Sequence, residues 1–424
     1  MLFFNIKMIF SKPIIQILAL ICSILLLNQN VKSQGTIPTV GKDFWLGFMN
    51  NADGQIPNTE LQLFISGKNA TSGTVSLPLQ GWSTTFVITP NITTTVTIPN
   101  NIAEHFSNDV VDTRGIHVVT LDTVSLFAIN LSDYSSDGTK VFPVKSLGTD
   151  YIISSYTGIS DFGGFKSEFL IVATADGTEI EIIPSVNTLG GNPAGVPYII
   201  NLEEGESYQV YAASHANELT GTRVRATDQS GDCRPFAVFA GSQCTNIPSW
   251  CSACDHIYDQ MYPIELWGSE YYLVPYSGTS GYTYKIIARD NGTNVTIDNG
   301  APIAMTAGQS IEFNAVSGTH YISSNNPIAV IQYMQGTTCS NSGDPAMLVL
   351  NADNQRINSV TFSTVTSTII NQHNLNLIVE TTDVGTVLLD NVVIPPVNYT
   401  SFPSNPTKSY AQLTIAQGRH SLFA

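Results

Sequence analysis

Basic residues are scarce in this chain. It holds 17 lysines and arginines against 33 aspartates and glutamates, which gives a formal net charge of −16 over 424 residues. Nucleic acids and anionic membrane surfaces are bound through clusters of Lys and Arg. The composition therefore excludes nucleic acid as an expected partner and argues against an electrostatic membrane surface.

Long apolar runs are also rare, and the one that occurs lies near the start, from Ile14 to Leu27. Lys7 and Lys12 precede it, and a small residue, Ser33, follows it, which is the pattern of a secretory signal peptide. A comfortable membrane span needs about 20 apolar residues, so an uncleaved anchor is the less favoured alternative. We predict a signal peptide over residues 1–33 and a secreted or cell-surface chain with no membrane insertion after cleavage. The remaining chain would carry 14 basic and 33 acidic residues, a net charge of −19.

Helical periodicity is nearly absent, and only one short helix is expected, near Pro99 to Phe106. Short runs that alternate polar and apolar residues dominate instead, such as TEIEII from Thr178 to Ile183. Alternation with period two between Gly, Asn, Asp and Pro residues indicates strands. The sequence therefore predicts an all-β protein.

Internal repetition is the most informative pattern. A strand, a turn ending in Gly-Thr and a second strand recur, with the Gly-Thr pairs beginning at residues 73, 177, 292 and 385. The segment Phe142–Ile153 also matches Tyr262–Leu273, so that Gly148 meets Gly268 and Tyr151 meets Tyr271.

This period, about 100 residues, fits a β-sandwich and is too long for a single propeller blade. We predict tandem pseudo-repeated β-sandwich modules packed together, and a four-part pseudo-symmetric arrangement stays open. The predicted modules span residues 34–160, 161–278 with the cysteine cluster, 279–370, and 371–424, the last one incomplete.

Six cysteines occur, and Cys22 would leave with the signal peptide. Clustered cysteines in an exported chain favour disulfides, whose pairing the sequence does not determine. An odd count leaves one thiol free or paired with another chain. The disulfide candidates are Cys233, Cys244, Cys251, Cys254 and Cys339.

Three more specific interpretations of the cysteine cluster have less support than disulfides. Cys244, Cys251, Cys254 and His256 could ligate zinc, but their spacing is irregular. A redox Cys-x-x-Cys pair needs a helix in a βαβ setting, which this chain lacks. Asp255 beside His256 could suggest a catalytic dyad, but no nucleophile motif accompanies it. We therefore expect no catalytic residues, no metal ligands and no cofactor.

Aromatic residues offer a binding interpretation. Trp250 sits between Pro248 and Cys251 in an expected loop, and loops carry much binding function. We predict that this loop faces a ligand through Trp250, Asp255 and His256. Stacking of Trp250 on a sugar is the alternative use of the same residue.

One stretch resembles a known family. DHIYDQMYPIELWGSEYYLVP, from Asp255 to Pro275, together with the preceding Cys254, is similar to a segment of the IgGFc-binding protein N-terminal domain and its bacterial secreted relatives. GKDFWLGFMNN at Gly41–Asn51 resembles the first strand of that domain, and GTTCSNSGDPAML at Gly336–Leu348 also fits. The resemblance spans residues 41–424.

This resemblance implies an extracellular, non-catalytic binding or adhesion protein that recognises a protein or glycoprotein. Two alternatives remain: a glycan- or mucin-binding surface module, and a degenerate secreted hydrolase. The residues indicate neither the ligand nor the oligomeric state.

Overall fold

The computed structural model describes residues 38–52, 59–90, 92–161, 164–227, 234–365, 370 and 372–424. The predicted signal peptide at 1–33 and the candidate Cys233 lie outside these residues. Strands make up nearly all the regular structure, which confirms the all-β prediction. Helix α2 (Asn100–Ala103) confirms the short helix expected in that region, and a second short α-helix among the described residues is α3 (Thr337–Ser340). None of the helices in the described ranges has the length and apolar character needed to cross a membrane.

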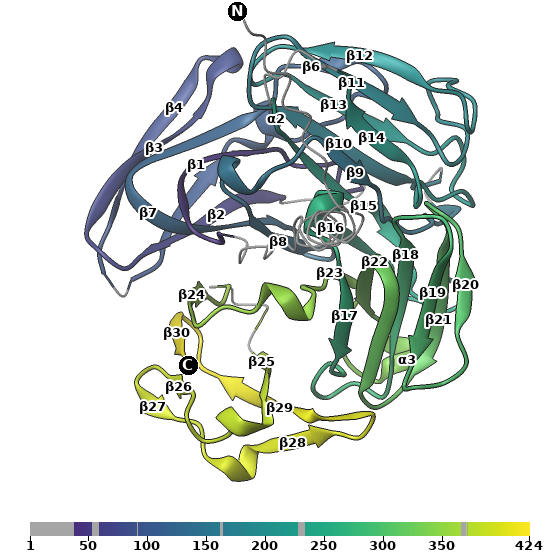
Figure 1. The fold of residues 1–424 in the computed structure, drawn as a ribbon. Helices are drawn as coiled ribbons and strands as arrows, with labels where there is room; N and C mark the ends of the chain where they lie inside the picture. Colours follow the sequence, from purple (N-terminus) through teal and green to yellow (C-terminus); the bar gives the residue numbers. More distant parts are fainter. Residues whose placement is uncertain are drawn as a thin grey trace, which may run out of the picture. The chain divides into compact units, whose positions relative to one another are not determined.

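The first group of strands forms a seven-stranded sheet around the long strand β7 (Figure 1). One half of β7 pairs with β1 and β3, and the other half pairs with β2 and β8. This sheet curls over a core that includes Phe44, Trp45 and Leu126. Its strands are β1 (Gly41–Leu46), β2 (Glu60–Gly67), β3 (Thr71–Leu77), β4 (Trp82–Ile88), β5 (Thr94–Ile98), β7 (Ile116–Leu131) and β8 (Asp137–Val141).

The second group is a sandwich of two sheets, with strand orders β16-β15-β10-β13-β6 and β12-β11-β14-β9. Phe169 from one sheet and Ile180 from the other meet in one core. The strands are β6 (Val111–Asp112), β9 (Asp150–Ile152), β10 (Ser167–Ala173), β11 (Thr178–Ile183), β12 (Tyr198–Leu202), β13 (Ser207–Tyr211), β14 (Arg223–Ala226), β15 (Phe236–Thr245) and β16 (Asp255–Gln260).

The third group is again a seven-stranded sheet, with β22 in the place that β7 has in the first. β22 pairs with β17 and β19 along its first half and with β18 and β23 along its second half. The strands are β17 (Gly268–Leu273), β18 (Tyr282–Ala288), β19 (Thr293–Ile297), β20 (Ile303–Met305), β21 (Ser310–Val316), β22 (His320–Met334) and β23 (Ala346–Val349).

The fourth group consists of two small sheets, β24-β30-β26-β27 and β25-β29-β28. Among the described residues, the buried members of the core between them are Val379, Val387 and Ile394. The strands are β24 (Ser359–Ser363), β25 (His373–Glu380), β26 (Leu388–Leu389), β27 (Val392–Val393), β28 (Tyr399–Phe402), β29 (Asn405–Ile415) and β30 (Arg419–Phe423).

Matching contacts recur at the start of the second and third groups. The hydroxyl of Tyr151 donates to Phe236 O at 2.8 Å, and the hydroxyl of Tyr271 donates to Ile328 O at 2.6 Å. A Cβ atom at Gly148 would lie 2.4 Å from Pro263 Cβ, and one at Gly268 would lie 2.3 Å from Ala352 Cβ, so neither position has room for a side chain. We infer from these matched contacts that the segments Phe142–Ile153 and Tyr262–Leu273 are copies of one unit.

Strand pairing also refines the proposed division into modules. β9, β17 and β24 each pair with a later strand of their own group, although the predicted boundaries place them in the preceding module. We therefore propose boundaries at three short 3₁₀ helices, η2 (Val144–Ser146), η4 (Ile264–Leu266) and η5 (Asp353–Gln355). The repeat used in the sequence begins at β2, β10, β18 and β25, each of which directly follows β1, β9, β17 or β24, and this explains the shift.

The turns of the repeat are formed as predicted in three of the four copies. Gly177, Gly292 and Gly385 have positive φ, which glycine adopts at little cost. The prediction is wrong for the first copy. There the chain turns between β2 and β3, and Gly73 lies inside β3, opposite Phe86.

The four groups contact one another in chain order, and the last contacts the first. Leu170 from the second group lies in the core of the first, and Ile287 from the third lies in the core of the second. Tyr272 from the third group packs with Phe402 from the fourth. The hydroxyls of Ser363 in β24 and Ser66 in β2 are 2.8 Å apart.

Candidate functional site

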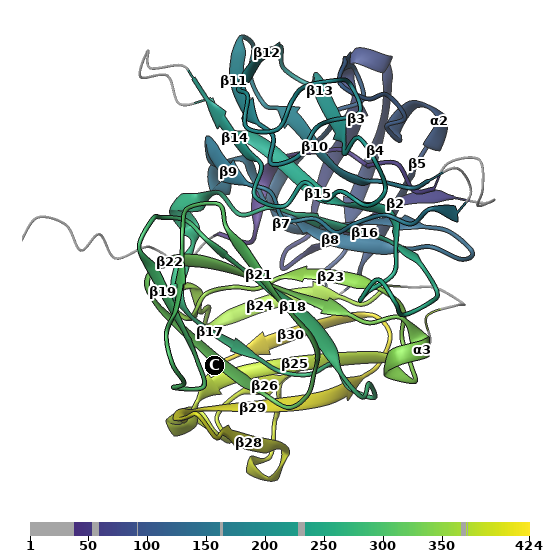
Figure 2. The same cartoon turned by 90° about the vertical axis from the view of Figure 1, so that its right-hand side faces the viewer.

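Three loops meet at one edge of the packed sheets, and we call them the three-loop surface. They are residues 132–136 before β8, residues 246–254 before β16, and residues 335–345 before β23 (Figure 2). The three strands lie side by side, because one carboxylate oxygen of Asp137 in β8 accepts hydrogen bonds from Tyr258 N of β16 at 3.0 Å and Met347 N of β23 at 3.2 Å. Because the strands all begin at the same edge, the loops that precede them gather there.

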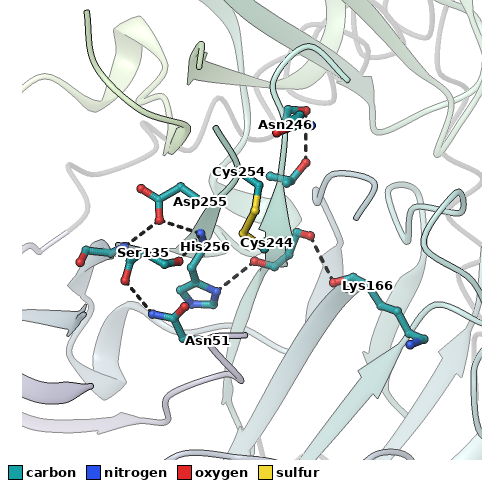
Figure 3. The surroundings of a disulfide bond; sticks show 11 residues. Asn51, Ser135, Lys166, Cys244, Asn246, Cys254, Asp255 and His256 are labelled. Atoms are coloured by element: carbon teal, nitrogen blue, oxygen red, sulfur yellow. Dashed lines mark hydrogen bonds between the residues drawn. A yellow bond between two sulfur atoms is a disulfide. The ribbon is translucent and has the colours of Figure 1, made fainter. Parts of the chain in front are cut away.

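Two disulfides hold the middle loop. Cys244–Cys254 closes its base with a Cα–Cα distance of 5.3 Å (Figure 3), and Cys251–Cys339 ties it to α3 with a Cα–Cα distance of 5.5 Å. The sequence suggested disulfides without their pairing, and the structure supplies the pairing for four of the five candidates.

Hydrogen bonds also join the middle loop (residues 246–254) to the loop at residues 335–345. Gly336 N donates to Ile247 O at 3.0 Å, and Thr338 Oγ1 donates to Ser252 O at 3.2 Å. Loops fixed at several points lose little conformational entropy when a partner binds.

The exposed side chains of this surface include two large aromatics. Trp250 in the middle loop is 67% exposed, and Tyr134 in the first loop is 77% exposed. Ile247, in contrast, is fully buried and anchors the underside of the middle loop. Exposed serine, threonine and asparagine residues lie on the same loops, among them Ser249, Ser252, Thr337 and Asn341. The surface thus offers both exposed aromatic rings and hydrogen-bonding side chains, which suits a protein or sugar surface.

The prediction that Asp255 and His256 face a ligand is not met by their positions. Both lie in β16 rather than in the loop, and they are 5% and 0% exposed. Asp255 Oδ1 accepts hydrogen bonds from Ser136 N at 2.7 Å and from His256 N at 2.8 Å, which ties the first loop to β16. The structure thus separates these two residues from the exposed Trp250.

His256 is buried as a neutral ring. Its Nδ1 donates to Ser242 O at 3.0 Å (Figure 3), and burial lowers the pKa of His256 to about 4. Burial also raises the pKa of the neighbouring Asp255 well above its usual value. A dyad with no access to solvent cannot take a proton from a substrate, so this pair has a structural position.

Asp259 and Gln260 complete the structural role of this strand, and the sequence reasoning gave them none. Asp259 Oδ1 accepts from Thr139 Oγ1 of β8 at 2.5 Å, and Asp259 Oδ2 accepts from Val349 N of β23 at 2.8 Å. Gln260 Oε1 accepts from Phe142 N at 2.7 Å. Burial raises the pKa of Asp259 to about 6. The spacing of Asp255 and Asp259 was the available signal, because residues four apart share one strand face.

The zinc interpretation lacks its ligands here, because Cys244, Cys251 and Cys254 are all in disulfides. Across the described part of the chain, no three His, Cys, Asp or Glu side chains are grouped to hold a metal ion.

Comparison with known proteins gives a family match that includes most of the residues described above. The model of the family "IgGFc binding protein" matches residues 137–424, which is more than half of the chain. The match begins at the first residue of β8 and includes both disulfides and all of β16.

A curated relative is also similar to this chain. The human IgGFc-binding protein is 23% identical over 302 residues, which cover 70% of this chain but only 5% of the human protein. This chain therefore spans a small fraction of that relative's length. Because the family model covers most of the sequence, this chain belongs to the IgGFc-binding protein family.

Proposed function

We propose that this chain is a secreted or cell-surface, non-catalytic binding protein that recognises an extracellular protein or glycoprotein through the three-loop surface. The observation that carries the proposal is Trp250, a large aromatic side chain that is 67% exposed on a loop fixed by two disulfides. Exposed, rigidly held Trp and Tyr residues are frequent centres of binding energy.

An extracellular location is supported by the same disulfides, because they form and persist in oxidising compartments. The apolar run near the N-terminus supports export by a signal peptide. The human relative is named for binding the Fc part of IgG, so an IgG Fc fragment is the first partner to test.

The absence of catalysis is also part of the proposal. The Asp255–His256 pair, which gave the sequence its best catalytic candidate, is buried and hydrogen-bonded within the fold. This burial counts against the degenerate hydrolase.

Glycan binding is the second candidate, and the pair of exposed rings favours it. Trp250 and Tyr134 are both largely exposed, on a surface whose loops also expose hydroxyl and amide side chains. Sugar rings bind such faces through their apolar C–H surfaces while their hydroxyls bond the polar rim.

The test measures binding of three probes to the wild-type protein: an IgG Fc fragment, a purified mucin, and a glycan array. We expect saturable binding of a protein or glycoprotein probe that weakens about tenfold or more in Trp250→Ala. Val397→Ala is the matched control, because Val397 is 89% exposed in the fourth group and should be neutral.

The outcomes separate the candidates. Array signal that Trp250→Ala removes, without binding of protein probes, would favour glycan recognition. Binding that Trp250→Ala and Tyr134→Ala leave unchanged would contradict the assignment of the three-loop surface.

A further inference from the structure

Two Asn-Gly pairs occur in the sequence, Asn291 with Gly292 and Asn299 with Gly300, and an aspartate precedes each of them. All four residues are exposed, in the turns on either side of β19. An asparagine before a glycine is prone to deamidation, because glycine has no Cβ atom to hinder the attack of its N–H on the asparagine amide carbon. The shared Asp-Asn-Gly sequence makes the two pairs equivalent, so a difference between them has to come from the fold.

The pair at Asn299 is held at both reacting groups. Gly300 N, which would be the nucleophile, donates a hydrogen bond to Ile297 O at 2.8 Å. Asn299 Nδ2, which would leave as ammonia, donates to Ser404 O at 2.8 Å. Cyclisation would break both bonds, so the fold protects this pair.

The pair at Asn291 has the opposite arrangement. Among the described residues, neither Gly292 N nor Asn291 Nδ2 has a hydrogen-bond partner. Asn291 Oδ1 accepts a hydrogen bond from Ala307 N at 3.0 Å. A donor in this position polarises the amide carbonyl and stabilises the negative charge that develops on its oxygen during attack.

The Gly-Thr repeat provides an equivalent turn in the second group. Asp176 Oδ1 accepts a hydrogen bond from Glu204 N at 3.0 Å, in the same way as Asn291 Oδ1 accepts one from Ala307 N. An aspartate therefore fits this position of the turn and keeps the same bond.

The two turns differ at the N–H group of the glycine. Gly177 N donates to Glu203 Oε2 at 2.9 Å. The counterpart of Glu203 in the third group is Thr306, one position before the residue whose N–H holds the Asn291 oxygen. Because threonine has no carboxylate, Gly292 N lacks the acceptor that Gly177 N has.

We propose that Asn291 is a site of spontaneous deamidation in the folded protein and that it reacts much faster than Asn299. Gly292 N loses its proton to solvent hydroxide and attacks Asn291 Cγ, which forms the N–Cγ bond of a succinimide. The Cγ–Nδ2 bond breaks, and the amide nitrogen takes a proton from water and leaves as ammonia. Water then opens the ring at either carbonyl and leaves aspartate or isoaspartate at position 291.

The two products affect the turn differently. Aspartate keeps an oxygen for Ala307 N, as Asp176 does for Glu204 N. Isoaspartate adds a methylene group to the main chain between β18 and β19 and removes one from the side chain, so we expect the bond to Ala307 N to be lost. Either product adds a negative charge to the third group. This site uses none of the residues of the three-loop surface and goes beyond the function proposed above.

The experiment incubates the purified wild-type protein in a mildly alkaline buffer and measures aspartate and isoaspartate at both positions by peptide mapping with mass spectrometry. In the folded protein, deamidation at Asn291 should be about tenfold or more faster than at Asn299, because two hydrogen bonds protect the second pair. In urea-unfolded protein the two rates should agree within about twofold, because those hydrogen bonds are then absent.

Two variants test the role of the acceptor. Thr306→Glu supplies the carboxylate that Glu203 provides in the second group, so it should slow deamidation at Asn291 about fivefold and leave Asn299 unchanged. The reverse variant, Glu203→Ala, should raise isoaspartate formation at Asp176 about fivefold, because an Asp-Gly pair forms the same succinimide.

Three results would overturn the proposal. They are the absence of product at Asn291 in the folded protein, equal rates at Asn291 and Asn299 in the folded protein, and rates at Asn291 and Asp176 that both variants leave unchanged. The comparison of the two Asn-Gly pairs uses the wild-type protein alone, so it does not depend on a variant that fails to fold.

Discussion

The loop at 246–254 and the strand β16 that follows it are adjacent in the sequence but opposite in character. The loop is held by two disulfides and exposes Trp250, whereas the strand is buried along its whole length and held by side-chain hydrogen bonds. The strand lies in the stretch on which the resemblance to the family was recognised, yet its side chains join β8, β16 and β23. The difference teaches that such a stretch can be buried while the side chain available to a partner lies in the loop before it.

Removing the disulfide between the 246–254 loop and α3 should cause the largest loss of stability among the changes that compare this loop with β16. Cys251 and Cys339 are separated by 88 residues, so the double change to Ser should cost about 4.5 kcal/mol of unfolding free energy by the loop-entropy estimate. The same change at Cys244 and Cys254, separated by 10 residues, should cost about 2.7 kcal/mol. Urea unfolding of both variants measures the difference, and equal losses would contradict a chain-entropy origin.

Asp259→Ala should destabilise the strand nearly as strongly. It removes the acceptor of the buried Val349 N and one of the two acceptors of Gln260 N and of Thr139 Oγ1, which should cost about 3 kcal/mol. Asp259→Asn keeps one side-chain oxygen and should cost less. Thermal or urea unfolding measures both variants. A loss of unfolding free energy below 1 kcal/mol for Asp259→Ala would mean that the packing of β16 against β8 and β23 does not depend on this carboxylate.

The change of the unfolding free energy with pH should reflect the titration of the Asp259 carboxyl. Burial raises the pKa of Asp259 from 3.8 to about 6, so the folded state binds a proton more tightly than the unfolded state does. Its contribution to stability is therefore full at low pH and declines as pH rises from about 4 through about 6, by up to about 3 kcal/mol.

Asp259→Asn removes this term, and comparison with the wild type cancels the buried histidines, which titrate in both proteins. Measured at a series of pH values, the unfolding free energy of Asp259→Asn should increase relative to that of the wild type as the pH rises to 7. A constant difference between them would exclude a raised pKa at Asp259.

Trp250→Ala should have the smallest effect on stability. A side chain that is 67% exposed buries little area, so the unfolding free energy should change by less than about 0.5 kcal/mol. The measurement is urea unfolding beside the binding assay, where the same variant should lose affinity. A stability loss above 2 kcal/mol would show that Trp250 supports the fold.

Much of the fold could be predicted from local pattern. Alternation indicated strands, Asp-Gly and Asn-Gly pairs indicated turns at Gly177 and Gly292, and the matched Gly148 and Gly268 occupy equivalent contacts. The strands and turns depend on local backbone conformation, and the matched glycines are visible as internal repetition, and a single sequence reveals both.

The site was less predictable, because it depends on strands distant in the sequence. Asp255 and His256 were predicted in a loop because they follow the clustered cysteines directly, but they lie in β16, where Ser136 N and Ser242 O satisfy them in the interior. Tyr134 gave no signal, since its place on the same three-loop surface as Trp250 follows from β8 lying against β16. The partner of Cys251 lies 88 residues away, and spacing alone does not select it.

The contact between Ser66 and Ser363 gives every group of strands two neighbours. A single proteolytic nick at η2 or η5, which neither disulfide spans, would therefore leave the two fragments associated through two separate interfaces. Such a nicked protein should run as one species on a sizing column and separate into fragments only after denaturation.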